Sequence, residues 1–97
     1  MGFVQMIEFK SSDIGGIRKE GEDWERATEG KRTARRQLLA RDRNDPGRYF
    51  MIVFFDSYES AMANSQLPET QASADAFAAL SDRAPTFYDL DILDDRS

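Results

Sequence analysis

The segment RYFMIVFFDS, residues Arg48–Ser57, most constrains the fold of this chain. Seven consecutive residues, Tyr49–Phe55, are apolar or aromatic. The run follows a turn signal, Asp45-Pro46-Gly47, and precedes a helix-start signal, Asp56-Ser57. An apolar run this short and this rich in β-branched and aromatic residues is typical of a strand buried on both faces.

Side chains of a strand point alternately to its two faces, and both faces of this run are apolar. We call the two groups the odd set and the even set. The odd set is Tyr49, Met51, Val53 and Phe55, and the even set is Phe50, Ile52 and Phe54. Something must therefore cover each face of the sheet.

The rest of the chain predicts strands and helices in a definite order. The helix between the first two strands is expected to be reliable from Ile17, and the Arg-rich segment fits an edge strand, with a helix as the alternative. Asp56-Ser57-Tyr58-Glu59 resembles a capping box, and Pro68 interrupts the helix that follows it. The expected elements are a strand at 3–9, a helix at 17–29, a strand within 32–43, a strand at 49–55, helices from 56 and over 69–81, and a strand at 86–93.

This order predicts an α+β fold of the ferredoxin-like βαββαβ type. Four strands would form one antiparallel sheet, and two helices would cover one of its faces. With 97 residues the chain is expected to be one domain, residues 1–97.

Composition restricts the function classes. The net charge of −5 disfavours nucleic acid as a partner. No apolar run approaches the length of about 18 residues that a membrane-spanning helix requires, so no membrane contact is expected. The first ten residues lack the features of a signal peptide, and the cytoplasm is the expected location.

The chain contains neither histidine nor cysteine. Zinc, copper and non-haem iron sites would lack their usual ligands, and a Ser-His-Asp triad is impossible. We therefore expect no metal and no cofactor, and no histidine that could act as a general base or bind haem iron.

Two helices can cover only one face of the sheet, so the other face predicts a homodimer. We expect the even set in the subunit's own core and the odd set against the partner. Seven of the thirteen basic residues lie between Lys31 and Arg48, and Asp89, Asp91, Asp94 and Asp95 follow near the C-terminus. The Arg-rich edge strand of one subunit would meet the Asp-rich last strand of the other, unless these charges are simply solvated.

The run RYFMIVFFDSYESAMANSQLPET, followed by a helix with Phe77 and Leu80 and a strand after Pro85, resembles the dimeric α+β barrel superfamily. Within it, the chain is most similar to the antibiotic-biosynthesis-monooxygenase-like domains. The resemblance implies a homodimer with facing sheets and a small pocket between helices and sheet. Some members oxidise aromatic polyketides without metal or flavin, some degrade haem, and some isomerise or decarboxylate. The haem-degrading branch uses a histidine that this chain lacks.

Members that oxidise quinol-like substrates rely on Asn, Trp and Tyr residues in that pocket, which makes Trp24, Asn64 and Tyr49 candidate catalytic residues. Arg35 is a fourth candidate, because it could bind an anionic substrate. Trp24 in the first helix does not match the family position relative to Asn64. Trp24 is alternatively a core residue, and Asn64 an exposed or capping residue. Arg35 could bind an anionic group or belong to the dimer interface.

Two functions are compatible with these residues. The first is a cofactor-independent monooxygenase-like enzyme that acts on a small aromatic or polyketide-like molecule, with Asn64 or Arg35 stabilising an oxyanion. The second is a homodimer without catalytic activity that binds a small ligand or only assembles. A cavity of about 300 Å³ or more with convergent polar groups would favour the enzyme.

Overall fold

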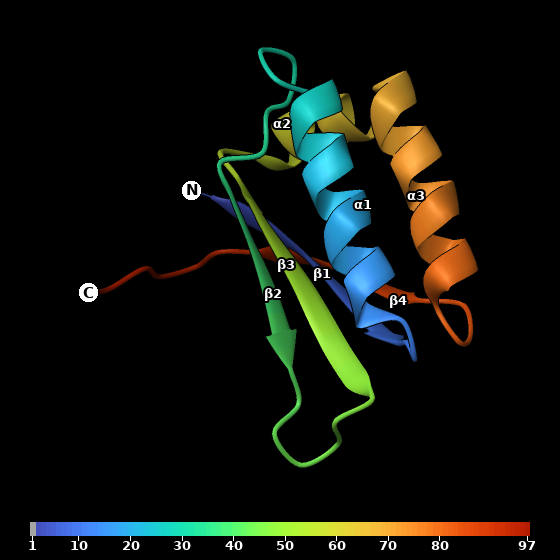
Figure 1. Ribbon diagram of the computed structural model, residues 1–97. Helices are drawn as coiled ribbons and strands as arrows, with labels where there is room; N and C mark the ends of the chain where they lie inside the picture. Colours follow the sequence, from blue (N-terminus) through green and yellow to red (C-terminus); the bar gives the residue numbers. More distant parts are fainter. Residues whose placement is uncertain (1) are drawn as a thin grey trace.

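A computed structural model describes residues 2–97 of the chain (Figure 1). The elements follow the expected order, with the second helical region divided in two. They are β1 (Phe3–Lys10), α1 (Ile14–Ala27), β2 (Arg36–Arg41), β3 (Arg48–Phe55), α2 (Tyr58–Ser65), α3 (Pro68–Leu80) and β4 (Thr86–Asp91).

The four strands form one antiparallel sheet in the order β2-β3-β1-β4, which confirms the predicted ferredoxin-like α+β fold. β3 lies inside the sheet between β1 and β2, as its two apolar faces indicated. β2 is an edge strand, as its charge predicted, although it spans only Arg36–Arg41. Figure 1 shows α1 and α3 side by side on one side of the sheet.

The expected orientation of β3 is wrong. The odd set faces the helices and is 5–8% exposed, whereas Phe50, Ile52 and Phe54 lie on the opposite face and are only partly buried. Side-chain size did not decide the orientation. β1 and β2 are parallel to each other, and the hand of the crossover through α1 determines which face the helices cover.

Aromatic packing joins the odd set to the helices. The ring of Phe9 lies 4.6 Å from that of Phe77 in α3 and 5.5 Å from that of Tyr49 in β3. Ile17 of α1 and Ala61 of α2 are each 1% exposed in the same cluster. The core therefore lies between the helices and β1 and β3.

The helix ends differ from the predictions by a few residues. α1 begins at Ile14, because the Asp13 side chain accepts a hydrogen bond from the Gly16 N–H and caps the glycine-rich first turn. Ser57, one residue later than predicted, caps α2 by accepting from Ser60 N. Pro68 begins α3, where its missing N–H costs nothing. Within residues 2–97, no helix is long and apolar enough to cross a membrane.

The face of the sheet opposite the helices has an apolar centre and a charged corner. Arg48 Nε donates to Glu8 Oε2 at 2.6 Å, and Tyr88 Oη donates to Glu8 Oε1 at 3.2 Å. The hydrogen bond from Arg48 is the main cause that lowers the pKa of the Glu8 carboxyl below its usual range. We call this face of the sheet the open face.

Two glycines of α1 provide a matched test of the helix. A Cβ at Gly21 would meet no atom within 4 Å, whereas a Cβ at Gly16 would lie 2.6 Å from Asp13 Oδ2 and 3.1 Å from Leu80 Cδ2. Gly21→Ala should raise the free energy of unfolding by about 0.5–1 kcal/mol, through helix propensity and a less flexible unfolded chain.

Gly16→Ala should displace the Asp13 cap and leave the protein about 1 kcal/mol or more less stable than Gly21→Ala. Urea unfolding followed by circular dichroism measures both changes. Equal stabilisation by the two substitutions would contradict the capping role of Asp13.

Candidate functional site

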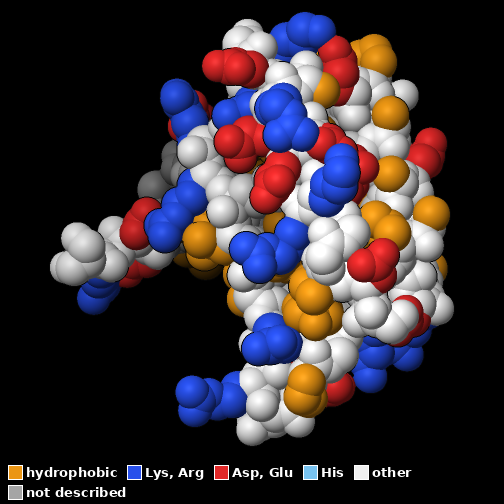
Figure 2. Space-filling model, viewed as in Figure 1, with side chains coloured by type: hydrophobic (Ala, Val, Ile, Leu, Met, Phe, Trp, Pro, Cys, Tyr) orange, Lys and Arg blue, Asp and Glu red, His pale blue; other side chains and the backbone are white. Residues whose placement is uncertain are grey.

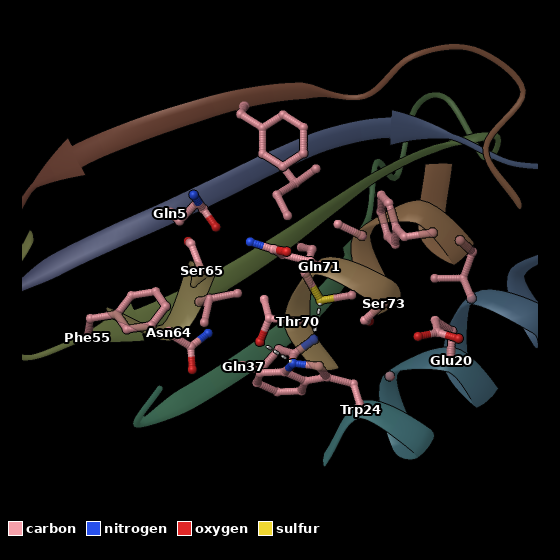
Figure 3. Close-up of a pocket in the computed structure, with 18 residues that line it drawn as sticks. Gln5, Glu20, Trp24, Gln37, Phe55, Asn64, Ser65, Thr70, Gln71 and Ser73 are labelled. Carbon is pink, nitrogen blue, oxygen red and sulfur yellow. Dashed lines mark hydrogen bonds between the residues drawn. The ribbon is translucent and has the colours of Figure 1, made fainter. Parts of the chain in front are cut away.

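A cavity of about 220 Å³ lies between the helices and the sheet (Figure 3). Its sheet side is formed by odd-numbered residues of β1 and β3, including Ile7, Met51 and Val53. α1 contributes Trp24, and α3 contributes Phe77 together with smaller residues. Most of its surface is apolar, so an apolar ligand would gain by leaving water there.

Polar groups from four elements converge on this cavity. They are uncharged amides and hydroxyls, and α1 adds the Glu20 carboxylate. Figure 3 shows Gln5, Asn64 and Ser65 near one end of the cavity and Glu20 at the other. The amide and hydroxyl residues are Gln5 of β1, Gln37 of β2, Asn64 and Ser65 of α2, and Thr70, Gln71 and Ser73 of α3.

Asn64 is 5% exposed and lines the cavity, so the expectation of an exposed residue is wrong. Its Oδ1 accepts a hydrogen bond from the backbone N–H of Thr33 at 3.2 Å. This bond determines which side of the amide carries the nitrogen. Among residues 2–97, Asn64 Nδ2 makes no hydrogen bond, so this N–H group is free to donate to a ligand.

Trp24 also lines the cavity, and it links two helices. Its indole N–H donates to Thr70 Oγ1 at 3.0 Å, which joins α1 to α3 (Figure 3). The guanidinium of Arg32 lies 5.8 Å from the centroid of the indole ring. Because its N–H group is already paired within the protein, Trp24 can offer a ligand mainly its aromatic surface.

Gln5 and Gln37 bring amides from two strands to the same cavity. Gln37 Nε2 donates to the Met51 sulfur at 2.8 Å, and Gln5 Nε2 donates to Asp89 Oδ1 at 3.4 Å. The sequence did offer a signal for Gln5, which is a polar residue in an apolar strand. It offered none for Gln37, because β2 is polar throughout and a glutamine there is unremarkable.

The other two candidates lie outside the cavity lining. Arg35 Nε and Nη2 donate to the Asp56 carboxylate at 3.0 and 2.7 Å on the surface, and this pairing lowers the pKa of Asp56. Tyr49 is 7% exposed and stacks against Phe9 in the core. The structure thus brings Trp24 and Asn64 together in one cavity and places Arg35 and Tyr49 elsewhere, and the catalytic role of all four stays a prediction.

The cavity can hold a ring and hydrogen-bond its substituents, but its lining offers little acid–base chemistry. Within residues 2–97, the only ionisable side chain that lines it is Glu20. Amide N–H groups can stabilise a negatively charged oxygen, and amide carbonyls can accept from a hydroxyl. No three acidic side chains of the described chain lie close enough to hold a metal ion together.

The Trp24–Thr70 hydrogen bond gives a testable link between α1 and α3. Thr70→Val keeps the side-chain shape but leaves the indole N–H without its acceptor, so we expect a loss of about 1 kcal/mol in the free energy of unfolding. Thr70→Ser retains the hydroxyl and should lose less. Urea denaturation measures both variants, and a Thr70→Val protein as stable as the wild type would show that the bond contributes nothing.

Comparison with known proteins supports the fold. No family model and no curated protein matches the chain. Among solved structures, a Nitrosomonas europaea protein named as an antibiotic biosynthesis monooxygenase superposes with a TM-score of 0.77 at 11% identity, covering 95% of this chain and 90% of its own. A Caulobacter crescentus CB15 protein with the same name gives 0.76 at 14% identity, over 96% and 92%.

The protein Rv0793 of Mycobacterium tuberculosis superposes with a TM-score of 0.79 at 14% identity, over the whole length of both chains. At these identities the similarity concerns the backbone, and the names give no substrate. The chain therefore has the ferredoxin-like α+β fold of the antibiotic-biosynthesis-monooxygenase-like proteins.

Proposed function

We propose that this protein binds a small aromatic molecule of one or two rings and oxygenates it without a metal or an organic cofactor. The observation that carries the proposal is the cavity, where the face of Trp24 and the free Nδ2 of Asn64 meet an apolar surface. The fold shared with proteins named as monooxygenases is consistent with this activity.

The cavity volume sets the size of the ligand. An apolar cavity of about 150 Å³ is large enough for benzene, and pockets for drug-sized molecules start at about 300 Å³. The cavity of about 220 Å³ falls between these values. It is also below the volume that we expected of an enzyme, although the convergent polar groups that we expected are present. This volume matches a ligand of one or two rings.

A hydroxyarene is the substrate class that such a site can activate. Loss of its hydroxyl proton gives an electron-rich oxyanion that can react with O₂ directly. For a phenol the overall reaction converts a ring C–H to a quinone carbonyl. One oxygen atom enters the carbonyl, the other leaves as water, and the substrate supplies all four electrons. Asn64 Nδ2 would donate to the oxyanion and stabilise it.

A ligand-binding protein without catalytic activity is the second candidate. It is favoured by the lining within residues 2–97, whose only ionisable side chain, Glu20, lies at the opposite end of the cavity from Asn64 (Figure 3). Under the oxygenase proposal, no ionisable side chain of this lining stands beside Asn64 to take the proton of the substrate. Binding of aromatic molecules without consumption of O₂ would support the second candidate.

Asn64→Asp tests the oxygenase directly. The substitution keeps an oxygen that can accept from Thr33 N and replaces the Nδ2 donor with a second oxygen. With 1-naphthol as substrate, we expect O₂ consumption, measured with an oxygen electrode, to fall by about 100-fold or more.

Asn44→Asp is the matched control, because Asn44 lies in the exposed loop between β2 and β3 and should leave the rate unchanged. If the wild-type protein consumes no O₂ with any one- or two-ring hydroxyarene, the oxygenase proposal is refuted.

We also propose that the protein is a homodimer whose two open faces pack together. Apolar side chains from all four strands lie on this face, and Leu38, Tyr88 and Leu90 are 36%, 39% and 43% exposed. An apolar patch of several hundred Å² is unusual on a monomer. A second copy, related by a two-fold axis, would cover it with an identical surface.

The charges of the two sheet edges do not specify how the two copies are oriented. β2 carries Arg36 and Arg41, and β4 carries Asp89 and Asp91, at opposite edges of the sheet. Arg36 lies on the open face, whereas Arg41, Asp89 and Asp91 lie in register with residues of the helix face. The expected contact between the basic and acidic edges of two subunits stays a prediction.

Leu38 and Leu39 form a matched pair for testing the dimer. They are adjacent and equally exposed, at 36% and 37%, but Leu38 lies on the open face and Leu39 on the helix face. Leu38→Glu should shift the mass measured by light scattering at micromolar concentration from dimer to monomer, whereas Leu39→Glu should leave it a dimer. A monomeric wild-type protein would refute the proposed interface.

A further inference from the structure

We infer that the cavity selects uncharged over anionic aromatic molecules, and that ligands reach it through an acidic hollow between α1 and β2. This inference rests on the proposed function, because it concerns the ligand of the same cavity. The inference specifies the charge of the ligand. Neither the fold nor the proposed reaction determines this charge.

The hollow between α1 and β2 adjoins the main cavity. Both are lined by Ile17, Gly21, Gln37 and Met51. A Cβ at Gly21 would meet no atom within 4 Å, so this part of α1 leaves open space. A ligand that moves between the hollow and the cavity must pass the Gln37 side chain, which is held by one bond to Met51. We call this hollow the access hollow.

The charged side chains that line this route are mostly acidic. Glu22 and Glu25 line the access hollow and Glu20 lines the cavity, against a single basic lining residue, Arg18. All four belong to α1, whose outer surface is covered by acidic and basic side chains in Figure 2. A hollow with net negative charge lowers the local concentration of anions and slows their association.

The interior of the cavity provides no cationic partner for a carboxylate. Among residues 2–97, no lysine or arginine lines the main cavity. Its polar groups are neutral amides and hydroxyls, which are weaker partners for a permanent carboxylate than a guanidinium. Transfer of an ionised carboxylate from water into such a site is unfavourable, whereas an uncharged amide of the same shape finds hydrogen-bond partners.

Three basic side chains that neighbour lining residues in the chain or in space already have partners. Arg32, over the Trp24 ring, donates to the Glu25 carbonyl oxygen at 2.7 Å. Lys31 pairs with Glu69 at 2.6 Å. Lys19 pairs with Asp23 at 2.9 Å. An anionic ligand that used one of these three cations would have to displace its partner, and Arg18 lies at the access hollow, outside the cavity lining.

A pair of probes with the same shape tests the inference. 6-Hydroxy-2-naphthamide is neutral at pH 7.5, and 6-hydroxy-2-naphthoate carries one negative charge. Dissociation constants can be measured by quenching of Trp24, the only tryptophan of the chain, and by calorimetry. We expect the amide to bind at least about tenfold more tightly than the carboxylate.

Two variants identify the cause of the preference. Combined Glu22→Gln and Glu25→Gln, at residues outside the cavity lining, should strengthen binding of the carboxylate about threefold or more and leave the amide nearly unchanged. Gln37→Arg places a cation where the cavity meets the access hollow and should strengthen carboxylate binding about tenfold or more. Gln66→Arg, at an exposed residue outside both lining sets, is the control and should change neither constant. Circular dichroism would confirm that each variant is folded.

Each outcome separates this inference from the proposed function. Equal or tighter binding of the carboxylate by the wild-type protein would overturn the charge selectivity, even if O₂ is consumed. Preference for the amide without O₂ consumption would support the selectivity and refute only the oxygenase. Failure of both probes to bind would overturn the selectivity and the aromatic ligand together.

Discussion

The packing of β3 against the helices is the interaction on which the rest of the structure depends. The odd set meets Ile17, Ala61 and Phe77 and forms the core with Phe3 and Phe9 of β1. Burial of one large apolar side chain contributes about 1.5–3 kcal/mol, so these few residues supply much of the hydrophobic stabilisation of a chain this small. This packing holds the helices against the sheet. The shape of the space between the two layers therefore depends on the side chains that occupy it.

That space is filled unevenly, and the cavity results. At one end of the sheet, the Phe9 ring stacks on Tyr49 and meets the Phe77 ring edge-on. Elsewhere the facing positions of the helices carry small residues, among them Gly21, Ser65, Ser73 and Ala74, which do not reach the sheet. Trp24 spans part of the gap and is held by Thr70. The same layer thus contains a close-packed aromatic core and a cavity with polar groups, and within residues 2–97 Glu20 is the only charged side chain that lines this cavity.

Structural features that depend on short-range sequence patterns could be predicted, whereas features that depend on neighbours in space could not. The order of elements, the edge position of β2 and the start of α3 at Pro68 follow from short-range patterns of apolar residues, charge and proline. Trp24 and Asn64 were candidates through a family resemblance, and both line the cavity. Gln37, Thr70 and Gln71 were not, because a polar residue on a polar edge strand or helix carries no signal until its neighbours in space are known.

The sequence by itself determined that β3 is a central strand with two apolar faces, that no histidine or cysteine takes part in any chemistry, and that the helices separate strands in a ferredoxin-like order. Only the tertiary structure decided which face the helices cover. Both faces of β3 are apolar, so hydrophobicity does not distinguish them, and the hand of the crossover does. The tertiary structure also decided where the side chains of Arg35 and Asn64 lie. The first pairs with Asp56 at the surface and the second faces a cavity, because long-range packing, rather than residue type, sets the surroundings of a polar side chain.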